Sequence, residues 1–234
     1  MQASVHVCTH RSAMHTDNED RAVIGTTVLA STSGVEHATI AAPAIVAVLD
    51  GLGGHPAGDV ASDRAAHVLA EAVAPSNEAA ASALIAKADR AIHAAAREHP
   101  TYLGMGTTVA MVSLVGERSE VVIANVGDSP VFAIVDGSLT DLSTTDRGAG
   151  GALWQCLGAH EDHPVDPHVS HITVAAGDRL LLATDGLTDV VPNDAVEAIL
   201  REDAGTAARR LLALVDEAGS PDDVTIVVVE VLNG

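Results

Sequence analysis

Three apolar segments of this 234-residue chain end at an aspartate that adjoins a glycine. They read VAVLDG at Asp50, VIANVGD at Asp128 and LLLATDG at Asp185, and two further acidic clusters lie at 18–20 and 222–223. A carboxylate at the end of a buried strand is costly unless a cation neutralises it. Because all-oxygen ligand sets suit Mg²⁺ or Mn²⁺, the pattern indicates a site for a hard divalent cation.

Few basic side chains are available to neutralise these carboxylates. The chain has 12 lysines and arginines against 32 aspartates and glutamates, for a net charge of −20, and Lys87 is its only lysine. A single Asp-Gly pair is more often a turn than a ligand. Three such pairs on apolar segments, together with two acidic clusters, favour a metal site over three unrelated turns.

The composition argues against several other functions. An acidic protein repels phosphate backbones, and only three aromatic side chains are present on which bases could stack, so nucleic-acid binding is disfavoured. Lys87 does not lie in a phosphate-binding G-x-x-x-x-G-K-[ST] loop. A dinucleotide loop at Gly51 is also disfavoured, because Pro56 stands where the third glycine would be.

Apolar runs bounded by Gly, Pro and Asp predict strands, and apolar residues at helical spacing predict two pairs of helices. The predicted strands are 44–49, 109–115, 120–126, 131–135, 138–142, 168–174, 179–183 and 224–232. The predicted helices are 58–72, 80–95 with Ser76 or Asn77 as its N-cap, 195–201 and 206–217. This order predicts an α+β fold of two antiparallel β-sheets flanked by helix pairs, in a single domain spanning 1–234.

The cysteines and the apolar runs indicate in which cellular compartment the protein is expected. Cys8 and Cys156 are too few and too far apart for a disulfide framework. The first residues lack the pattern of a signal peptide, and the longest apolar runs fall short of the roughly 18 residues that a membrane span needs. We therefore expect a soluble cytoplasmic protein with no membrane insertion.

Six motifs occur in order along nearly the whole chain. They are Asn18-Glu19-Asp20, DGLGGHPAGDVAS at 50–62, GTT at 106–108, NVGDS at 125–129, LLLATDGLTD at 180–189 and PDDVTIVVV at 221–229. In this series the chain resembles the bacterial branch of the metal-dependent PPM (type-2C) serine/threonine protein phosphatases. The resemblance implies a four-layer αββα sandwich, in agreement with the order of elements above, and hydrolysis of phosphoserine and phosphothreonine in phosphoproteins.

The resemblance also implies a centre of two Mn²⁺ or Mg²⁺ ions. Asp50 matches the ligand that bridges the ions, and the Gly51 carbonyl would bind one of them. Asp185 and Asp222 match the ligands of the other ion. Two cations about 4 Å apart lower the pKa of a bridging water and neutralise phosphoryl oxygens, so this chemistry needs no protein nucleophile.

Further acidic residues complete the implied site. Asp20 and Glu19 match residues that hold metal-bound waters, and both belong to the expected metal-binding set. Asp128, together with Asp185, matches a third and weaker metal site of bacterial members.

His15 is the first departure from the family pattern, which usually has a phosphate-gripping arginine three residues before the Asn of the first acidic motif. A neutral imidazole offers at most one donor, whereas guanidinium is bidentate and always charged. We expect His15 to bind phosphate weakly, and better as it becomes protonated, with Arg11 as an alternative. Asp223 stands where the family usually has Asn, and so adds a negative charge.

The segment 141–157 is the second departure, because it is compact and glycine-rich where the family usually inserts a flap that shapes the substrate groove. Pro130 replaces the usual arginine after the GDS motif. Trp154 and Cys156 are expected to be packing residues. Other histidines are expected to be solvated or to structure loops rather than to form a zinc or acid site: His55, His160, His163, His168 and His171.

Two functions remain open at this stage. The first is a phosphatase, with Asp50, Asp185, Asp222 and His15 as its catalytic set, that acts on a protein phosphorylated by a bacterial Ser/Thr kinase. The second is a weakly active or inactive phosphatase-like module that binds a partner or phosphopeptide. The retained carboxylates favour the enzyme, and we expect a monomer that does not bind nucleic acid.

Overall fold

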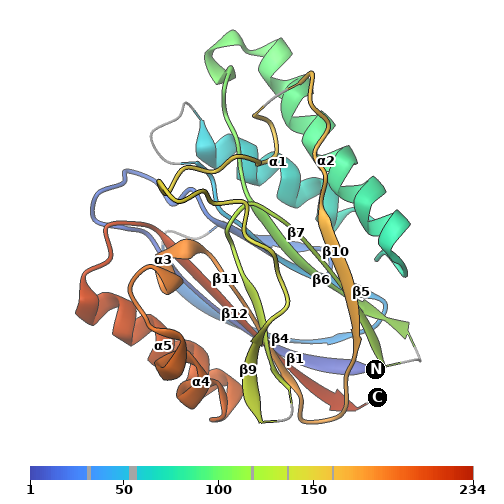
Figure 1. Ribbon diagram of the computed structural model, residues 1–234, viewed down its shortest axis with the longest axis vertical. Coiled ribbons are helices and arrows are strands. Elements are labelled where there is room, and N and C mark those ends of the chain that lie inside the picture. Colours follow the sequence, from blue (N-terminus) through green and yellow to red (C-terminus); the bar gives the residue numbers. More distant parts are fainter. Residues whose placement is uncertain (31–32, 53–56, 117–118, 136, 160, 234) are drawn as a thin grey trace.

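Two six-stranded antiparallel β-sheets face one another in the computed structural model of the chain, and helices cover both outer faces (Figure 1). The structure describes residues 1–234 except 31–32, 53–56, 117–118, 136, 160 and 234. The four-layer αββα sandwich predicted from the sequence is therefore confirmed.

The first sheet has the strand order β4-β1-β12-β11-β8-β9. Its strands are β4 (Ser33–Ala41), β1 (Gln2–His10), β12 (Val224–Asn233), β11 (Arg179–Ala183), β8 (Val131–Val135) and β9 (Ser138–Asp141). The end of β1 pairs with the start of β12, with His10 opposite Val224. Because of this register, the segment that follows β1 lies beside the segment that precedes β12, and the first and last acidic motifs come together.

The second sheet has the order β10-β7-β6-β5-β2-β3. Its strands are β10 (His168–Thr173), β7 (Glu120–Val126), β6 (Val109–Val115), β5 (Ala44–Leu49), β2 (Arg21–Ile24) and β3 (Thr27–Leu29). Every residue of β5 is buried. Ile45, Ala47 and Leu49 face the helices, whereas Val46 and Val48 face the other sheet, which explains a strand that is apolar without alternation.

Helices form the outer layers on both sides. The pair α1 (Gly58–Ala70) and α2 (Glu78–Glu98) packs on the second sheet, and α2 leads into the short 3₁₀ helix η1 (Pro100–Tyr102). On the first sheet lie α3 (Asp185–Thr188), α4 (Asn193–Leu200) and α5 (Ala204–Ala218). Asn77 caps α2, because its side chain accepts a hydrogen bond from the Ala80 amide at 3.0 Å. None of the described helices has the length and hydropathy to cross a membrane.

The observed elements follow the predicted ranges closely. Five of the eight predicted strands have the observed bounds. The other three differ from the observed strands by one residue at one end: 138–142, 168–174 and 224–232. No separate bounds were predicted for β1 to β4, and α3 was not predicted. The expectation for Trp154 was wrong, because its side chain is 60% exposed, whereas Cys156 is buried as expected.

Candidate metal centre

One end of the sandwich carries a cleft of about 590 Å³ in which the predicted carboxylates meet. Asp50 follows β5, Asp185 begins α3 directly after β11, and Asp222 precedes β12. Asp128 follows β7 and also lines the cleft, as does Arg147 from the segment between β9 and β10. Residues from four separate parts of the sequence are thus brought to one cleft, as the metal-site interpretation requires.

Asp50 is positioned through its backbone by the threonines of the GTT motif. Its amide donates to the Thr108 hydroxyl at 3.1 Å, and its carbonyl accepts from the Thr107 hydroxyl at 2.8 Å and the Thr108 amide at 2.9 Å. Burial, followed by the negative charge of Asp20, raises the pKa of Asp50 well above its usual value. The Asp50 carboxylate therefore lies where a cation is needed to keep it ionised.

Gly51 must be a glycine because of how closely it packs on the start of α1. A Cβ at this position would lie 2.4 Å from the Gly58 carbonyl oxygen and 2.8 Å from the Glu19 carbonyl oxygen. The lack of a side chain lets the backbone after Asp50 approach the first acidic motif.

Asp20 is buried, and only part of its carboxylate is satisfied. Its Oδ2 accepts a hydrogen bond from the Thr184 hydroxyl at 2.9 Å, whereas Oδ1 is buried with no hydrogen-bond partner among the described residues. Burial raises its pKa well above the usual value, although the nearby hydroxyl groups of Thr225 and Thr184 oppose that effect. Within the same described part of the chain, Glu19 Oε2 is likewise buried without a hydrogen-bond partner, and burial raises the pKa of Glu19. Two carboxylate oxygens thus lack the partners that buried polar atoms normally have.

Asp223 joins the first and last acidic motifs. Its Oδ1 accepts from the Ser12 amide and its Oδ2 from the Glu19 amide, each at 2.7 Å. Its side chain is 3% exposed, so these hydrogen bonds are shielded from water. Asp222 is half exposed and remains available at the cleft. Asp223, which adds a negative charge relative to the family pattern, therefore fixes the loop that carries Glu19.

His15 lies beside these carboxylates. Its Nδ1 is 3.1 Å from Asp223 Oδ2 and 4.0 Å from Asp222 Oδ1, although the contact does not meet hydrogen-bond geometry. Burial lowers the pKa of His15, but the contact with Asp223 and the charges of Asp222 and Glu19 outweigh burial and raise that pKa. His15 is therefore charged over a wider pH range than a free histidine.

Arg11, the alternative to His15, is engaged in its own loop. Its guanidinium donates to the Ser12 carbonyl oxygen at 2.8 Å and to the His15 carbonyl oxygen. Both acceptors are backbone atoms of the segment after β1, so Arg11 stabilises the conformation in which His15 faces Asp223.

Arg147 is the residue in the cleft that the sequence analysis missed. Its guanidinium contacts Asp128, Asp185 and Asp189. Burial, followed by the charge of Asp128, raises the pKa of Asp185 to about 6. A signal was present, because Arg147 is the only basic residue in 141–157, but nothing in the sequence showed that this segment crosses the cleft.

The carboxylates fit divalent metal ions in their chemistry. They are oxygen donors, two of their buried oxygens lack hydrogen-bond partners, and burial raises several of their pKa values. As the side chains stand, no group of three or more His, Cys, Asp or Glu among the described residues is spaced to hold one ion. This spacing is expected of like charges that repel one another without a cation. His55 and His160 lie outside the described residues.

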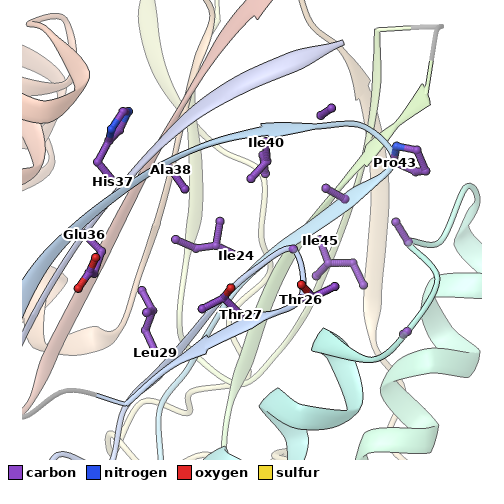
Figure 2. Close-up of a pocket in the computed structure, with 15 residues that line it drawn as sticks. Ile24, Thr26, Thr27, Leu29, Glu36, His37, Ala38, Ile40, Pro43 and Ile45 are labelled. Carbon is purple, nitrogen blue, oxygen red and sulfur yellow. The ribbon is translucent and has the colours of Figure 1, made fainter.

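A second pocket, of about 460 Å³, lies at the other side of the sandwich between β4 and the β2–β3 hairpin (Figure 2). Its lining combines apolar side chains such as Ile24, Leu29 and Ile40 with the polar side chains of Thr26 and Thr27 (Figure 2). Glu36 is the only carboxylate among the described residues that line it, so this part of the pocket lacks the clustered acids of the metal-site cleft.

A sandwich of two antiparallel sheets between helix layers, with clustered carboxylates at strand ends, defines the class of metal-dependent protein phosphatases that the motifs indicated. A sequence model described as Protein phosphatase 2C matches residues 35–216. The chain belongs to the protein phosphatase 2C family.

Named relatives agree with this assignment. The serine/threonine protein phosphatase PstP of Mycobacterium tuberculosis is 30% identical over 222 residues, which cover 85% of this chain and 42% of PstP. The chain thus spans less than half the length of that relative. The serine/threonine phosphatase stp of Listeria welshimeri is 30% identical over 215 residues, which cover 80% of this chain and 84% of stp.

Solved structures share the whole fold. The crystal structure of Mycobacterium tuberculosis PstP/Ppp has a TM-score of 0.82 and 26% identity, and covers 100% of both chains. A structure of the catalytic domain of PstP in complex with two manganese ions has a TM-score of 0.78 and 28% identity, with the same coverage.

Proposed function

We propose that this protein is a metal-dependent serine/threonine protein phosphatase that hydrolyses phosphoserine and phosphothreonine in phosphoproteins. The observation that carries the proposal is the meeting of Asp50, Asp185 and Asp222 in one cleft. Membership of the protein phosphatase 2C family supports it. Clustered buried carboxylates destabilise a protein unless a cation is bound, so a chain that had lost the activity would gain by losing them.

The proposed ligands follow the family motifs. Asp50 and the Gly51 carbonyl would hold one divalent ion, and Asp185 and Asp222 would hold a second. Asp20 and Glu19 would bind waters around these ions, and their buried oxygens, which have no hydrogen-bond partner among the described residues, support that role. When bound, two Mn²⁺ or Mg²⁺ ions supply a water of lowered pKa and neutralise phosphoryl oxygens.

His15 is proposed to bind the substrate phosphate. Its Nδ1 faces Asp223, which leaves Nε2 as the ring nitrogen that can donate to a phosphoryl oxygen. The neighbouring carboxylates favour the charged imidazolium, and the charged form attracts phosphate more strongly. Arg11 is proposed to act indirectly, since its hydrogen bonds hold the His15 segment in place.

The biological setting is proposed as well. The substrate would be a protein phosphorylated by a bacterial Ser/Thr kinase, and two free buried cysteines support a reducing, cytoplasmic compartment. The residues 1–234 would form one phosphatase domain that acts as a monomer. The exposed large apolar side chains support a monomer, since they come from separate segments: Met14, Val35, Val73, Leu103, Trp154 and Leu232.

The test is hydrolysis of p-nitrophenyl phosphate and of a phosphothreonine peptide, each with Mn²⁺ and with a chelator. We expect turnover that requires Mn²⁺ and is lost in Asp50→Asn. Asp166→Asn, a change in the loop before β10, is the matched control and should retain turnover. If the wild type binds the phosphopeptide but shows no Mn²⁺-dependent turnover, the protein is a phosphatase-like binding module instead.

A further inference from the structure

A guanidinium group lies between the carboxylates that the family pattern assigns to a third metal ion. Arg147 Nε is 3.2 Å from Asp128 Oδ2, and Arg147 Nη2 is 3.2 Å from Asp185 Oδ2. Asp189 binds the outer side of the same group, with its two oxygens 2.8 and 3.2 Å from Nη1 and Nη2. One cation thus contacts three carboxylates.

The same guanidinium also binds a backbone carbonyl oxygen. Arg147 Nε donates to the Gly151 carbonyl oxygen at 3.1 Å. Asp189 is held through its amide, which donates to the Asp185 carbonyl oxygen at 2.8 Å in α3. The fixed fork of a guanidinium suits several oxygens at once and remains charged at all physiological pH values.

The backbone of Arg147 is fixed beside Asp128 by its neighbour Asp146. The Asp146 carboxylate is fully buried and accepts hydrogen bonds from the Gly127 amide at 2.8 Å and from Gln155 Nε2 at 3.1 Å, and it lies 2.7 Å from His168 Nε2. In addition, the Asp146 amide donates to the Gly127 carbonyl oxygen at 2.9 Å. Gly127 directly precedes Asp128, so these bonds place Arg147 next to the Asp128 side chain.

Backbone pairing within the segment 141–157 also fixes the position of Arg147. Arg147 pairs with Leu153 in an isolated antiparallel bridge, and the Gly148 amide donates to the Ala152 carbonyl oxygen at 2.9 Å. The resulting tight loop crosses the cleft where the family usually inserts a flap.

We propose that Arg147 takes the place of a third metal ion between Asp128 and Asp185, so that each chain binds two divalent ions rather than three. The inference rests on the proposed function, since it concerns the same metal centre. In this role Arg147 is a positioning residue, because it holds Asp185 and neutralises Asp128. A guanidinium and a third ion cannot occupy the same space, and the charge of the guanidinium repels a cation there.

The test is the number of Mn²⁺ ions bound per chain, measured by equilibrium dialysis followed by inductively coupled plasma mass spectrometry. We expect two ions in the wild type and three in Arg147→Gln, the third with weaker affinity. Arg201→Gln is the matched control, because Arg201 forms a surface ion pair with Glu197, and it should still bind two. The double variant Arg147→Gln/Asp128→Asn should return to two. Circular dichroism checks that each variant is folded.

Asp128→Asn alone provides a second test that does not depend on the folding of Arg147→Gln. Because Arg147 and not a metal ion contacts Asp128, this variant should bind two ions, as the wild type does. A wild-type count of three, a count of two in folded Arg147→Gln, or the loss of an ion in Asp128→Asn would overturn the role of Arg147. A wild type that binds no Mn²⁺ would overturn the proposed function and this inference together.

Discussion

The His15 imidazole lies 3.1 Å from Asp223 Oδ2, where Asp223 also fixes the amides of Ser12 and Glu19. The histidine that replaces the usual phosphate-binding arginine is therefore attached to the carboxylate that joins the two acidic motifs. An arginine at this position would face the same carboxylates, Asp222 and Asp223, and we expect it to strengthen the phosphate contact proposed for His15.

His15→Arg is expected to lower the KM for a phosphothreonine peptide about tenfold. A hydrogen bond to a charged group is worth about 1.5–3 kcal/mol, and 1.4 kcal/mol corresponds to a factor of ten. Steady-state kinetics in saturating Mn²⁺ measures the effect.

Met14→Arg is the matched control for this substitution. Met14 is the preceding residue and is 77% exposed, so the variant adds the same charge without the same position. An unchanged KM in His15→Arg, or an equal decrease in Met14→Arg, would contradict a phosphate-binding role for position 15.

Gly186→Ala is expected to unfold the protein at a lower temperature. Gly186 lies in α3, where alanine normally stabilises a helix, but its Cβ would lie 2.0 Å from the Asp223 carbonyl oxygen. Overlap with backbone forces a shift, and such overpacking costs on the order of 3 kcal/mol. For a domain of this size we expect the Tm to fall by about 6–12 °C.

Gly150→Ala is the control, since no atom lies within 4 Å of a Cβ built at that position. Its Tm should stay within a degree or two of the wild type. A thermal melt followed by circular dichroism compares the two variants, and an unchanged Tm in Gly186→Ala would show that α3 does not pack on the Asp223 backbone as described.

Local sequence patterns predicted most of the strands and helices and the carboxylates of the metal-site cleft, but not Arg147. The run before Asp50 predicted both the buried strand β5 and the carboxylate at its end, because burial on two faces requires an apolar strand without alternation. The polar residues of β1 and β4, such as His6, Thr39 and His37, obscured those strands. Strand β1 pairs with β4 and with β12, both distant from it along the chain, and no local pattern records such pairings.

The role of Arg147 could not be read from the sequence for a similar reason. Its contacts join Asp128 and Asp185, which follow strands of different sheets, β7 and β11, through a loop whose path depends on buried Asp146. The composition of 141–157 predicted a compact, glycine-rich loop. It did not show that this loop would bring a cation into the metal centre, nor that it would leave Trp154 exposed.

The two cysteines are expected to react slowly in the native protein. Burial raises the pKa of both Cys8 and Cys156 from 9.0 to about 11, and only the thiolate is nucleophilic. At pH 8 the thiolate fraction is then about a hundredfold lower than in the unfolded chain. Reaction with 5,5′-dithiobis(2-nitrobenzoic acid) should be slower by at least that factor until denaturant is added. Cys156→Ala isolates Cys8, and fast native reaction of either thiol would contradict its burial.

The metal-free protein is expected to lose stability as the pH rises from about 4 to 6. Burial, followed by the charge of Asp128, raises the pKa of Asp185 to about 6, above its ordinary value of 3.8. A carboxyl with a raised pKa in the folded state contributes its full stability below the unfolded pKa and loses that stability as the pH rises through the folded pKa. The loss from Asp185 is on the order of 3 kcal/mol, or about 6–12 °C in Tm.

Other groups titrate in the same range, so the measurement is the difference in Tm between the wild type and Asp185→Asn in a chelator, from pH 4 to 8. The asparagine cannot ionise, and we expect it to become the more stable of the two as the pH passes 6. Adding Mn²⁺ at pH 7.5 should reverse the order, because the ion neutralises Asp185 and binds the folded state. A difference in Tm that stays constant from pH 4 to 8 would mean that Asp185 does not change its ionisation state in this range. Arg147 alone would then be sufficient to stabilise the charged Asp185 carboxylate without metal.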